Sequence, residues 1–404
     1  IRMTAPPAVP GLSVRPRKSE SCGIYSGKFT PTIKCNIDDG GNITSLQSCE
    51  ITDIDFKDKF TTPGLIDIQV NGFAGVDFHK RGLTAGEMDH ALAHLAASGV
   101  TCVLPTLITA SEKVLISRLE TLDRAISESV LGPLMVPGYH IEGPFLSPKE
   151  GCSGAHPAID MCPASKSLVT DLQDVSSRPI LIMTVAPEQK GVFDLIPFLI
   201  ERGIACAIGH TSASRHDIQA AISAGATLST HLGNGLPHIL NKNENPLFSQ
   251  LGEDGLTASF IVDGIHVHPQ SLQTYFRAKT LERSIIVTDA VSAAGKHLSP
   301  GFYDIGDVKI ERHQDGTVRI PGSMYLAGSS VTMDQMVRNL INWYDFSIDD
   351  ILLMARENPK PIVKGFVSDP SIGVPANLVH WHHRDGELHV RETSIGPWTI
   401  RPQY

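Results

Sequence analysis

One pattern recurs along the chain: an amphipathic helical segment, a glycine that ends it, and a short strand that is apolar on both faces. Three instances are "MDHALAHLAASGVTCVLPTLIT", "FDLIPFLIERGIACAIGHTSA" and "HDIQAAISAGATLSTHLGNG". The glycines are Gly99, Gly203 and Gly225, and helices often end at glycine because it tolerates the left-handed backbone conformation. Strands that are apolar on both faces are typical of parallel sheets covered on both sides. This pattern therefore favours alternating strands and helices around a buried parallel sheet.

The pattern extends over eight units. Further apolar strands are expected at 180–185, 256–262 and 283–287, and counting from "GLIDIQV" at 64–70 gives eight strands up to about residue 290. Eight strands that alternate with helices favour a closed barrel over an open sheet. The sequence thus predicts an α/β protein whose main domain is a (β/α)8, TIM-like barrel.

The two ends of the chain show a different pattern. Residues 1–62 hold short β-like segments separated by turns such as "DDGGN", and residues 367–404 alternate like antiparallel strands around the turn "RDGE". We expect the two ends to pair into one small β-sandwich domain beside a barrel of residues 63–366. A β-insertion is expected at about 302–325, after the eighth strand.

Composition argues against several classes of function. A net charge of −9 over 404 residues disfavours a nucleic-acid or acidic-membrane surface, because those partners need basic patches. The most apolar stretch, "VFDLIPFLIERGIACAIG", is interrupted by charges and a proline, so no membrane span is expected. Seven cysteines without a C-x-x-C pair fit a reduced, cytoplasmic protein better than a disulfide scaffold. The proline-rich N-terminal stretch does not read as a signal peptide.

Polar residues gather where the predicted strands end, which is where a parallel barrel builds its active site. They are Gln69 and Asn71 after the first strand, Glu142 after the third, His210 after the fifth, His231 after the sixth, Asp263 and His266 after the seventh, and Asp289 after the eighth. Zinc and similar divalent ions bind imidazole nitrogen and carboxylate oxygen, and a catalytic site keeps one coordination position open. We therefore expect Glu142, His210 and His231 to bind one metal ion, with Asp289 left as a base.

Histidines at strand ends also have an ordinary explanation. A single one is more often a hydrogen-bonded core or rim residue than a ligand, but four polar residues at four strand ends would each need a buried partner. The pair His90 and His94 lacks the acidic residue of an HExxH motif and is expected on a helix flank. His380, His382 and His383 are expected on an exposed surface strand.

The strand-end residues stand in motifs that resemble those of the N-acetylglucosamine-6-phosphate deacetylases of the amidohydrolase superfamily. In chain order the motifs are "GLIDIQVNG", "HIEGPFLSPKEGCSGAHP", "GHTSA", "THLGNG", "DGIHVHP", "TDAVSAAG" and "LAGSS". The resemblance covers about residues 61–365, nearly all of the barrel. It implies hydrolysis of the acetamide of N-acetylglucosamine 6-phosphate to glucosamine 6-phosphate and acetate.

The resemblance also implies roles for individual residues. The matches to Glu142, His210 and His231 hold one divalent metal: zinc, or else iron, manganese or cobalt. The family residue that corresponds to Asp289 activates the attacking water and protonates the leaving amine. The one that corresponds to His156 helps polarise the acetamide carbonyl. The positions implied in binding the sugar phosphate are Ala155, Asn234, Gly235, Asp263, His266, Leu326, Ala327, Gly328 and Ser329.

The first strand distinguishes this chain from many other amidohydrolases. Many carry His-x-His there and so hold a second metal, whereas this chain has Gln69 and Asn71, as deacetylases of this type do. Cyclic-amide hydrolases of the superfamily normally have that His-x-His and often a metal-bridging lysine on the fourth strand. Here the fourth strand, "PILIMTVAPE", ends without a lysine, which counts against that alternative.

The phosphate-binding segment departs from the family pattern. The family usually has Asn-Ala-Met beyond "THL", followed by an arginine that a neighbouring subunit contributes to the phosphate. This chain has Asn234, Gly235 and Leu236, and its only cation between 239 and 246 is Lys242, which binds phosphate as a point charge rather than bidentately. A homodimer is implied if Lys242 reaches a neighbour's site.

Three hypotheses follow from these residues. The leading one is a metal-dependent deacetylase of N-acetylglucosamine 6-phosphate, and its variant is a deacetylase of another N-acetylated amino sugar, with or without a phosphate. The second is a cyclic-amide hydrolase. A barrel kept as a binding scaffold would be expected to lose its metal or base residues, yet all four are present.

Overall fold

The computed structural model describes residues 6–25, 33–48 and 59–403. Its central sheet has eight parallel strands in the order β6-β9-β10-β11-β12-β13-β14-β15, as the sequence predicts. The strands are β6 (Leu65–Val70), β9 (Val100–Ile108), β10 (Tyr139–Glu142), β11 (Ile180–Val185), β12 (Ala205–Ile208), β13 (Leu228–Ser229), β14 (Thr257–Phe260) and β15 (Ser284–Ile286). The first four are buried throughout, because helices cover one face and the barrel interior the other.

Main-chain hydrogen bonds join the first strand to the segment after the last one. The N–H of Asp289 donates to the carbonyl of Gln69 at 3.0 Å, and the N–H of Asn71 donates to the carbonyl of Ala290 at 2.7 Å. These bonds close the barrel at the rim formed by the carboxyl ends of its strands. They also place Asn71 and Asp289, which are far apart in the sequence, side by side.

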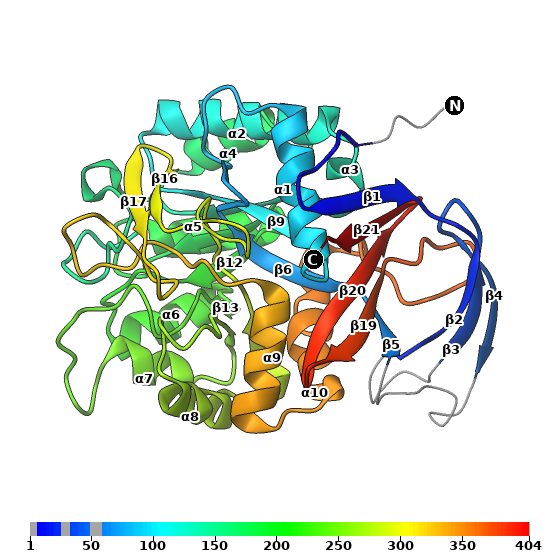
Figure 1. Cartoon of the computed structure of the whole chain (residues 1–404). Helices are drawn as coiled ribbons and strands as arrows, with labels where there is room; N and C mark the ends of the chain where they lie inside the picture. The colour runs from blue at the N-terminus through cyan, green and yellow to red at the C-terminus, as the bar shows by residue number, and fades with distance from the viewer. Residues whose placement is uncertain (1–5, 26–32, 49–58, 404) are drawn as a thin grey trace.

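Helices surround the barrel sheet (Figure 1). They are α1 (Ala85–Ala97), α2 (Glu112–Glu128), α3 (Gly132–Met135), α4 (Lys166–Asp174), α5 (Val192–Glu201), α6 (Arg215–Ala224), α7 (Pro246–Leu251), α8 (Pro269–Lys279), α9 (Met333–Tyr344) and α10 (Ile348–Leu352). The predicted glycine stops are confirmed, since Gly99, Gly203 and Gly225 have φ values of 93°, 68° and 122° just beyond α1, α5 and α6.

Both ends of the chain form the predicted small β-region beside the barrel. One sheet has the order β1-β21-β20-β19-β5 and a second has β2-β3-β4 (Figure 1). The strands are β1 (Leu12–Pro16), β2 (Glu20–Ile24), β3 (Ile33–Ile37), β4 (Ile43–Ser48), β5 (Lys59–Pro63), β19 (Leu378–Arg384), β20 (Glu387–Ile395) and β21 (Trp398–Pro402). Asp385 and Gly386 both have positive φ, which confirms the hairpin turn at "RDGE". Any β-segments at 26–32 or 49–58 lie outside the described residues.

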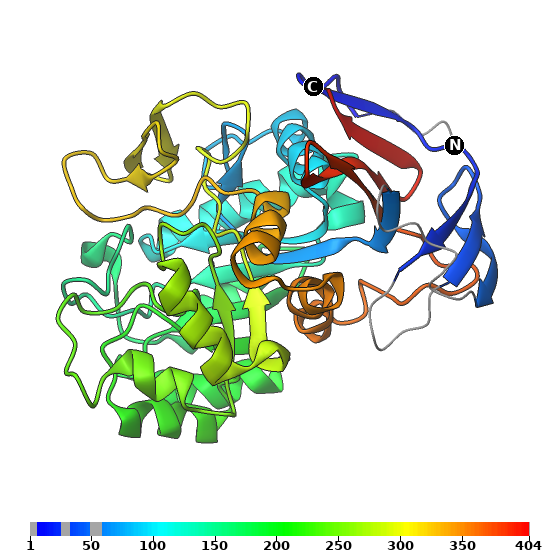
Figure 2. The same cartoon turned by 60° about the horizontal axis from the view of Figure 1, so that its bottom comes forward.

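The predicted β-insertion follows the last barrel strand. It contains β16 (Gly301–Ile305), β17 (Val308–Arg312) and β18 (Val318–Arg319), which pair antiparallel. In both views the β16–β17 hairpin lies on the opposite side of the barrel from the β2–β3–β4 sheet (Figures 1 and 2). A smaller hairpin, β7 (Gly72–Phe73) with β8 (Val76–Asp77), follows β6. Both hairpins therefore extend the rim at which the barrel is closed.

Three expectations from the sequence concern a histidine, the cysteines and membrane spans. The expectation that His380 is exposed is wrong: it is 4% exposed, because β19 lies between β20 and β5, and its Nδ1 is 2.9 Å from the hydroxyl of Thr61. The six cysteines in the described part of the chain are free thiols. Among the described helices, none is long and apolar enough to cross a membrane.

Candidate active site

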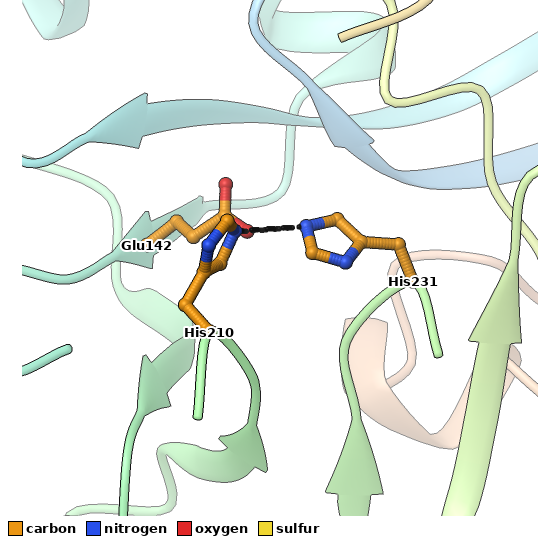
Figure 3. A group of neighbouring side chains, drawn as sticks. All are labelled: Glu142, His210 and His231. Carbon is orange, nitrogen blue, oxygen red and sulfur yellow. Dashed lines mark hydrogen bonds and ion pairs between the residues drawn. The ribbon is translucent and has the colours of Figure 1, made fainter. Parts of the chain in front are cut away.

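Three side chains converge at the carboxyl end of β10 and just beyond the carboxyl ends of β12 and β13 (Figure 3). Oε1 of Glu142 lies 3.2 Å from Nε2 of His210 and 2.9 Å from Nε2 of His231. The two Nε2 atoms are 3.1 Å apart. Among the described residues these three form the group that could hold a metal ion, and all three are buried.

Neighbouring groups fix the orientation of the three side chains. Nδ1 of His210 donates to the carbonyl of Cys152 at 2.6 Å, so its Nε2 faces the cluster with a free lone pair. The side-chain amide of Gln69 donates to Oε1 of Glu142 at 3.1 Å. Ligands held about 2.0–2.1 Å from a tetrahedral zinc lie about 3.3 Å from one another, close to the spacing seen here. The donor set and its spacing therefore fit a divalent ion.

Electrostatics in the cluster favour a positive charge. Burial opposes ionisation of Glu142, but the neighbouring rings of His156, His210 and His231 lower the pKa of its carboxyl well below the ordinary value. Burial likewise opposes a charge on His231, yet the contact with Glu142 raises its pKa to about 9. The buried carboxylate therefore favours a positive charge beside it, which either a proton on His231 or a bound divalent ion can supply.

Asp289 lies at the edge of this cluster and is held rigidly. Its Oδ1 accepts a hydrogen bond of 2.8 Å from Nδ2 of Asn71, and its carbonyl accepts one of 2.9 Å from the N–H of Ser329. Burial raises the pKa of Asp289 to about 6, a rise that the nearby His231 limits and the charge of Glu142 increases. A carboxyl with a pKa near neutrality is well matched to accepting and returning a proton.

His156 approaches the cluster from the loop after β10. Its Nδ1 accepts from the N–H of Thr109 at 3.3 Å, so the proton of the neutral ring belongs on Nε2, which lies 3.6 Å from Oε2 of Glu142. Burial and the neighbouring His210 lower the pKa of His156 to about 4. The ring can therefore present an N–H donor to a carbonyl oxygen in the pocket.

A pocket of about 240 Å³ opens above the cluster. Of the residues expected to bind substrate, six line it: Ala155, Asn234, Gly235, His266, Leu326 and Gly328. The remaining four are not among its described lining residues: Lys242, Asp263, Ala327 and Ser329.

Hydrogen bonds show how two of these four residues are held, and a third is exposed. Asp263 accepts a hydrogen bond of 2.6 Å from Nδ1 of His266 and so orients that ring. The hydroxyl of Ser329 donates to the carbonyl of Thr288 and braces the segment before Asp289. Lys242 is exposed and is not among the residues that line the pocket.

Two aromatic rings at the pocket were not expected from the sequence. His238 and Tyr325 both line it, and their ring centroids are 5.2 Å apart with an interplanar angle of 33°. They come from two irregular loops that meet only in the folded protein, so no strand-end pattern could reveal them. Among the described residues that line the pocket there is no lysine or arginine.

A (β/α)8 barrel that gathers a carboxylate, two imidazoles and a further aspartate at its strand ends is the architecture of an amidohydrolase enzyme. No protein-family model matches the chain. It is 32% identical over 398 residues to the N-acetylglucosamine-6-phosphate deacetylase of Danio rerio, covering 93% of this chain and 91% of that protein. It is 27% identical over 357 residues to the N-acetylgalactosamine-6-phosphate deacetylase of Escherichia coli O157:H7, covering 88% and 91%.

A solved structure agrees with these relatives. A mutant N-acetyl-D-glucosamine-6-phosphate deacetylase from Mycobacterium smegmatis, in complex with N-acetyl-D-glucosamine 6-phosphate, superposes with a TM-score of 0.81 at 26% identity. The match covers 95% of this chain and 99% of that one. The chain belongs to the N-acetylglucosamine-6-phosphate deacetylase family.

Proposed function

We propose that this protein hydrolyses the acetamide of N-acetylglucosamine 6-phosphate, releasing acetate and glucosamine 6-phosphate. The observation that carries the proposal is the convergence of Glu142, His210 and His231 beside Asp289, at the base of a pocket. The relatives' activities and the bound sugar phosphate in the M. smegmatis structure support the choice of substrate.

In this proposal Glu142, His210 and His231 hold one divalent ion, most simply zinc. When bound, such an ion polarises the acetamide carbonyl and increases the acidity of water. Asp289 takes the proton from the attacking water and returns it to the amide nitrogen, which then leaves as an amine. The Nε2–H of His156 donates to the carbonyl oxygen as negative charge develops on it.

The sugar and its 6-phosphate occupy the outer part of the pocket in this proposal. The His266 ring, oriented by Asp263, and the loop at Asn234 and Gly235 are available to the phosphate. Lys242 is assigned to the pocket of a partner subunit, which makes the working form a homodimer. The free thiols support a reducing compartment such as the cytoplasm.

One observation favours a second candidate. The described pocket lining carries no lysine or arginine, although a phosphate is normally recognised by such side chains. A deacetylase of an unphosphorylated N-acetylhexosamine is therefore the alternative substrate class, and N-acetylgalactosamine 6-phosphate is an epimeric alternative because a relative acts on it.

An acetate-release assay on the metal-loaded protein separates these candidates. Acetate release is measured for N-acetylglucosamine, its 6-phosphate and N-acetylgalactosamine 6-phosphate, and ring opening is measured separately for dihydroorotate, a cyclic amide, all at equal metal occupancy. We expect the highest kcat/KM for N-acetylglucosamine 6-phosphate. Equal kcat/KM for the phosphorylated and unphosphorylated glucosamine derivatives would contradict the phosphate assignment, and hydrolysis of dihydroorotate alone would contradict deacetylation.

A further inference from the structure

Asn71 has a hydrogen-bond acceptor that no group in the described part of the chain satisfies. Its side chain is 2% exposed and lines the pocket. Nδ2 donates to Oδ1 of Asp289 at 2.8 Å, whereas Oδ1 of Asn71 is buried without a partner. Buried acceptors are nearly always hydrogen-bonded, so an unsatisfied one at a substrate pocket indicates a group that the ligand supplies.

The orientation of this amide follows from its surroundings. The main-chain N–H of Asn71 donates to Ala290 at 2.7 Å, and its carbonyl accepts from Phe78 at 3.1 Å, so the backbone is fixed on both sides. The carboxylate of Asp289 accepts hydrogen bonds, and the amide must therefore turn its NH₂ group toward it. Oδ1 is then the atom left for the pocket.

We propose that Oδ1 of Asn71 accepts a hydrogen bond from the N–H of the substrate acetamide and so orients the nitrogen toward Asp289. This inference rests on the proposed function. Asn71, at the end of the first strand, would form this hydrogen bond only with an amide substrate, because an ester has no N–H in this position.

The chemistry explains why the nitrogen needs an acceptor of its own. A bond forms between the water oxygen and the carbonyl carbon, and the water proton passes to Asp289. Asp289 then protonates the nitrogen, and the C–N bond breaks with its electron pair going to the amine. Protonation requires the nitrogen lone pair to face Asp289, while the existing N–H points elsewhere. Because Asn71 contacts the same carboxylate, its Oδ1 lies within reach of that N–H.

The test compares an amide with an ester in variants of Asn71. N-acetylglucosamine 6-phosphate is assayed beside an analogue in which an O-acetyl group at the same carbon replaces the acetamide. In Asn71→Leu, which keeps the shape of the side chain, kcat for the amide should fall about 10- to 100-fold, the scale of one lost hydrogen bond in the transition state. The kcat for the ester should fall less, because the ester loses only the support that Nδ2 gives to Asp289, and KM should rise for the amide alone.

Asn339→Leu is the matched control, since Asn339 is also a buried asparagine but donates to the carbonyl of Val262 away from the pocket. It should leave the ratio of amide to ester rates unchanged. Metal content and circular dichroism are measured for every variant. If Asn71→Leu lowers both rates equally, Asn71 orients the water or only supports the fold, and the inference is overturned.

A measurement on the wild-type protein keeps the inference testable if the variants do not fold. The O-acetyl ester, which lacks the N–H, should have a KM about ten times that of the amide in the wild-type protein. Equal values would overturn the inference. A wild-type protein that hydrolyses neither the amide nor the ester would overturn the proposed function, and this inference with it.

Discussion

Replacing Asp289 by asparagine should remove activity and, in the metal-free protein, increase stability at neutral pH. Asp289 is 8% exposed, and burial raises the pKa of its carboxyl from 3.8 to about 6. A carboxyl whose pKa is higher in the folded protein stabilises the fold in its protonated form. That contribution is complete below about pH 4 and is lost as the pH rises through 6.

The size of the effect follows from the same pKa. A rise from 3.8 to about 6 corresponds to about 3 kcal/mol, so ionised Asp289 lowers the free energy of unfolding by up to that amount at pH 7.5. Asparagine carries no charge and tolerates the φ of +47° found at this position. Its carbonyl oxygen can also accept the hydrogen bond from Asn71. We therefore expect Asp289→Asn to be more stable by roughly 2–3 kcal/mol at pH 7.5 and about equal to wild type near pH 4.

Thermal unfolding of the chelator-treated protein, followed by circular dichroism, measures this difference at both pH values. For a chain of this length, 2–3 kcal/mol corresponds to a Tm increase of roughly 2–4 °C. Asp263→Asn is the control in which stability should change in the opposite direction. Contact with His266 outweighs burial and lowers the pKa of Asp263, so this variant should lose stability at pH 7.5. Metal-loaded Asp289→Asn should lose about 2–4 orders of magnitude in kcat. A Tm difference independent of pH, or near-normal turnover, would refute the reasoning.

Three further predictions concern the metal and the phosphate. His210→Ala and His231→Ala should each lose most of the bound divalent metal, as measured by elemental analysis, and full occupancy in both would place the metal elsewhere. Gly235→Ala should weaken metal affinity about 10- to 100-fold in a competition titration. The new Cβ would lie 2.8 Å from Nδ1 of His210 and would disturb the hydrogen bond of that ring to Cys152. An affinity equal to that of the wild type would show that the loop adjusts freely. Lys242→Ala should raise KM for N-acetylglucosamine 6-phosphate and leave KM for N-acetylglucosamine unchanged, and dilution to monomer should have the same effect. An equal change for both sugars would remove Lys242 from phosphate recognition.

The sequence predicted the barrel and the gathering of its strand-end residues because both depend on periodic patterns. Glycine stops and fully apolar strands located the units, and the carboxyl ends of parallel strands meet at one rim whatever the loops do. This is why Glu142, His210 and His231, from three different strands, could be expected to lie together. Their role as metal ligands stays a prediction.

Contacts between irregular segments could not be predicted in the same way. The pairing of His238 with Tyr325 depends on the course of two loops, for which no periodic signal exists. The burial of His380 depends on the strand order of the terminal sheet, which alternation alone does not reveal. Likewise, the sequence indicated only that the end of the first strand lacks the two metal-binding histidines of other amidohydrolases. The hydrogen bonds of Gln69 to Glu142 and of Asn71 to Asp289 became visible only in the folded protein.

Because the last strand must join the first to close the barrel, the residues of the site are brought together at two different stages of folding. The candidate metal ligands come from β10, β12 and β13, all between residues 139 and 231, so this portion of the sheet could assemble around an ion before the chain is complete. Asn71 and Asp289, by contrast, are 218 residues apart and meet only when the last strand joins the first. A partly folded or truncated barrel could therefore bind metal and remain inert. In the proposed mechanism, proton transfer to the substrate therefore requires that the whole ring of strands has formed.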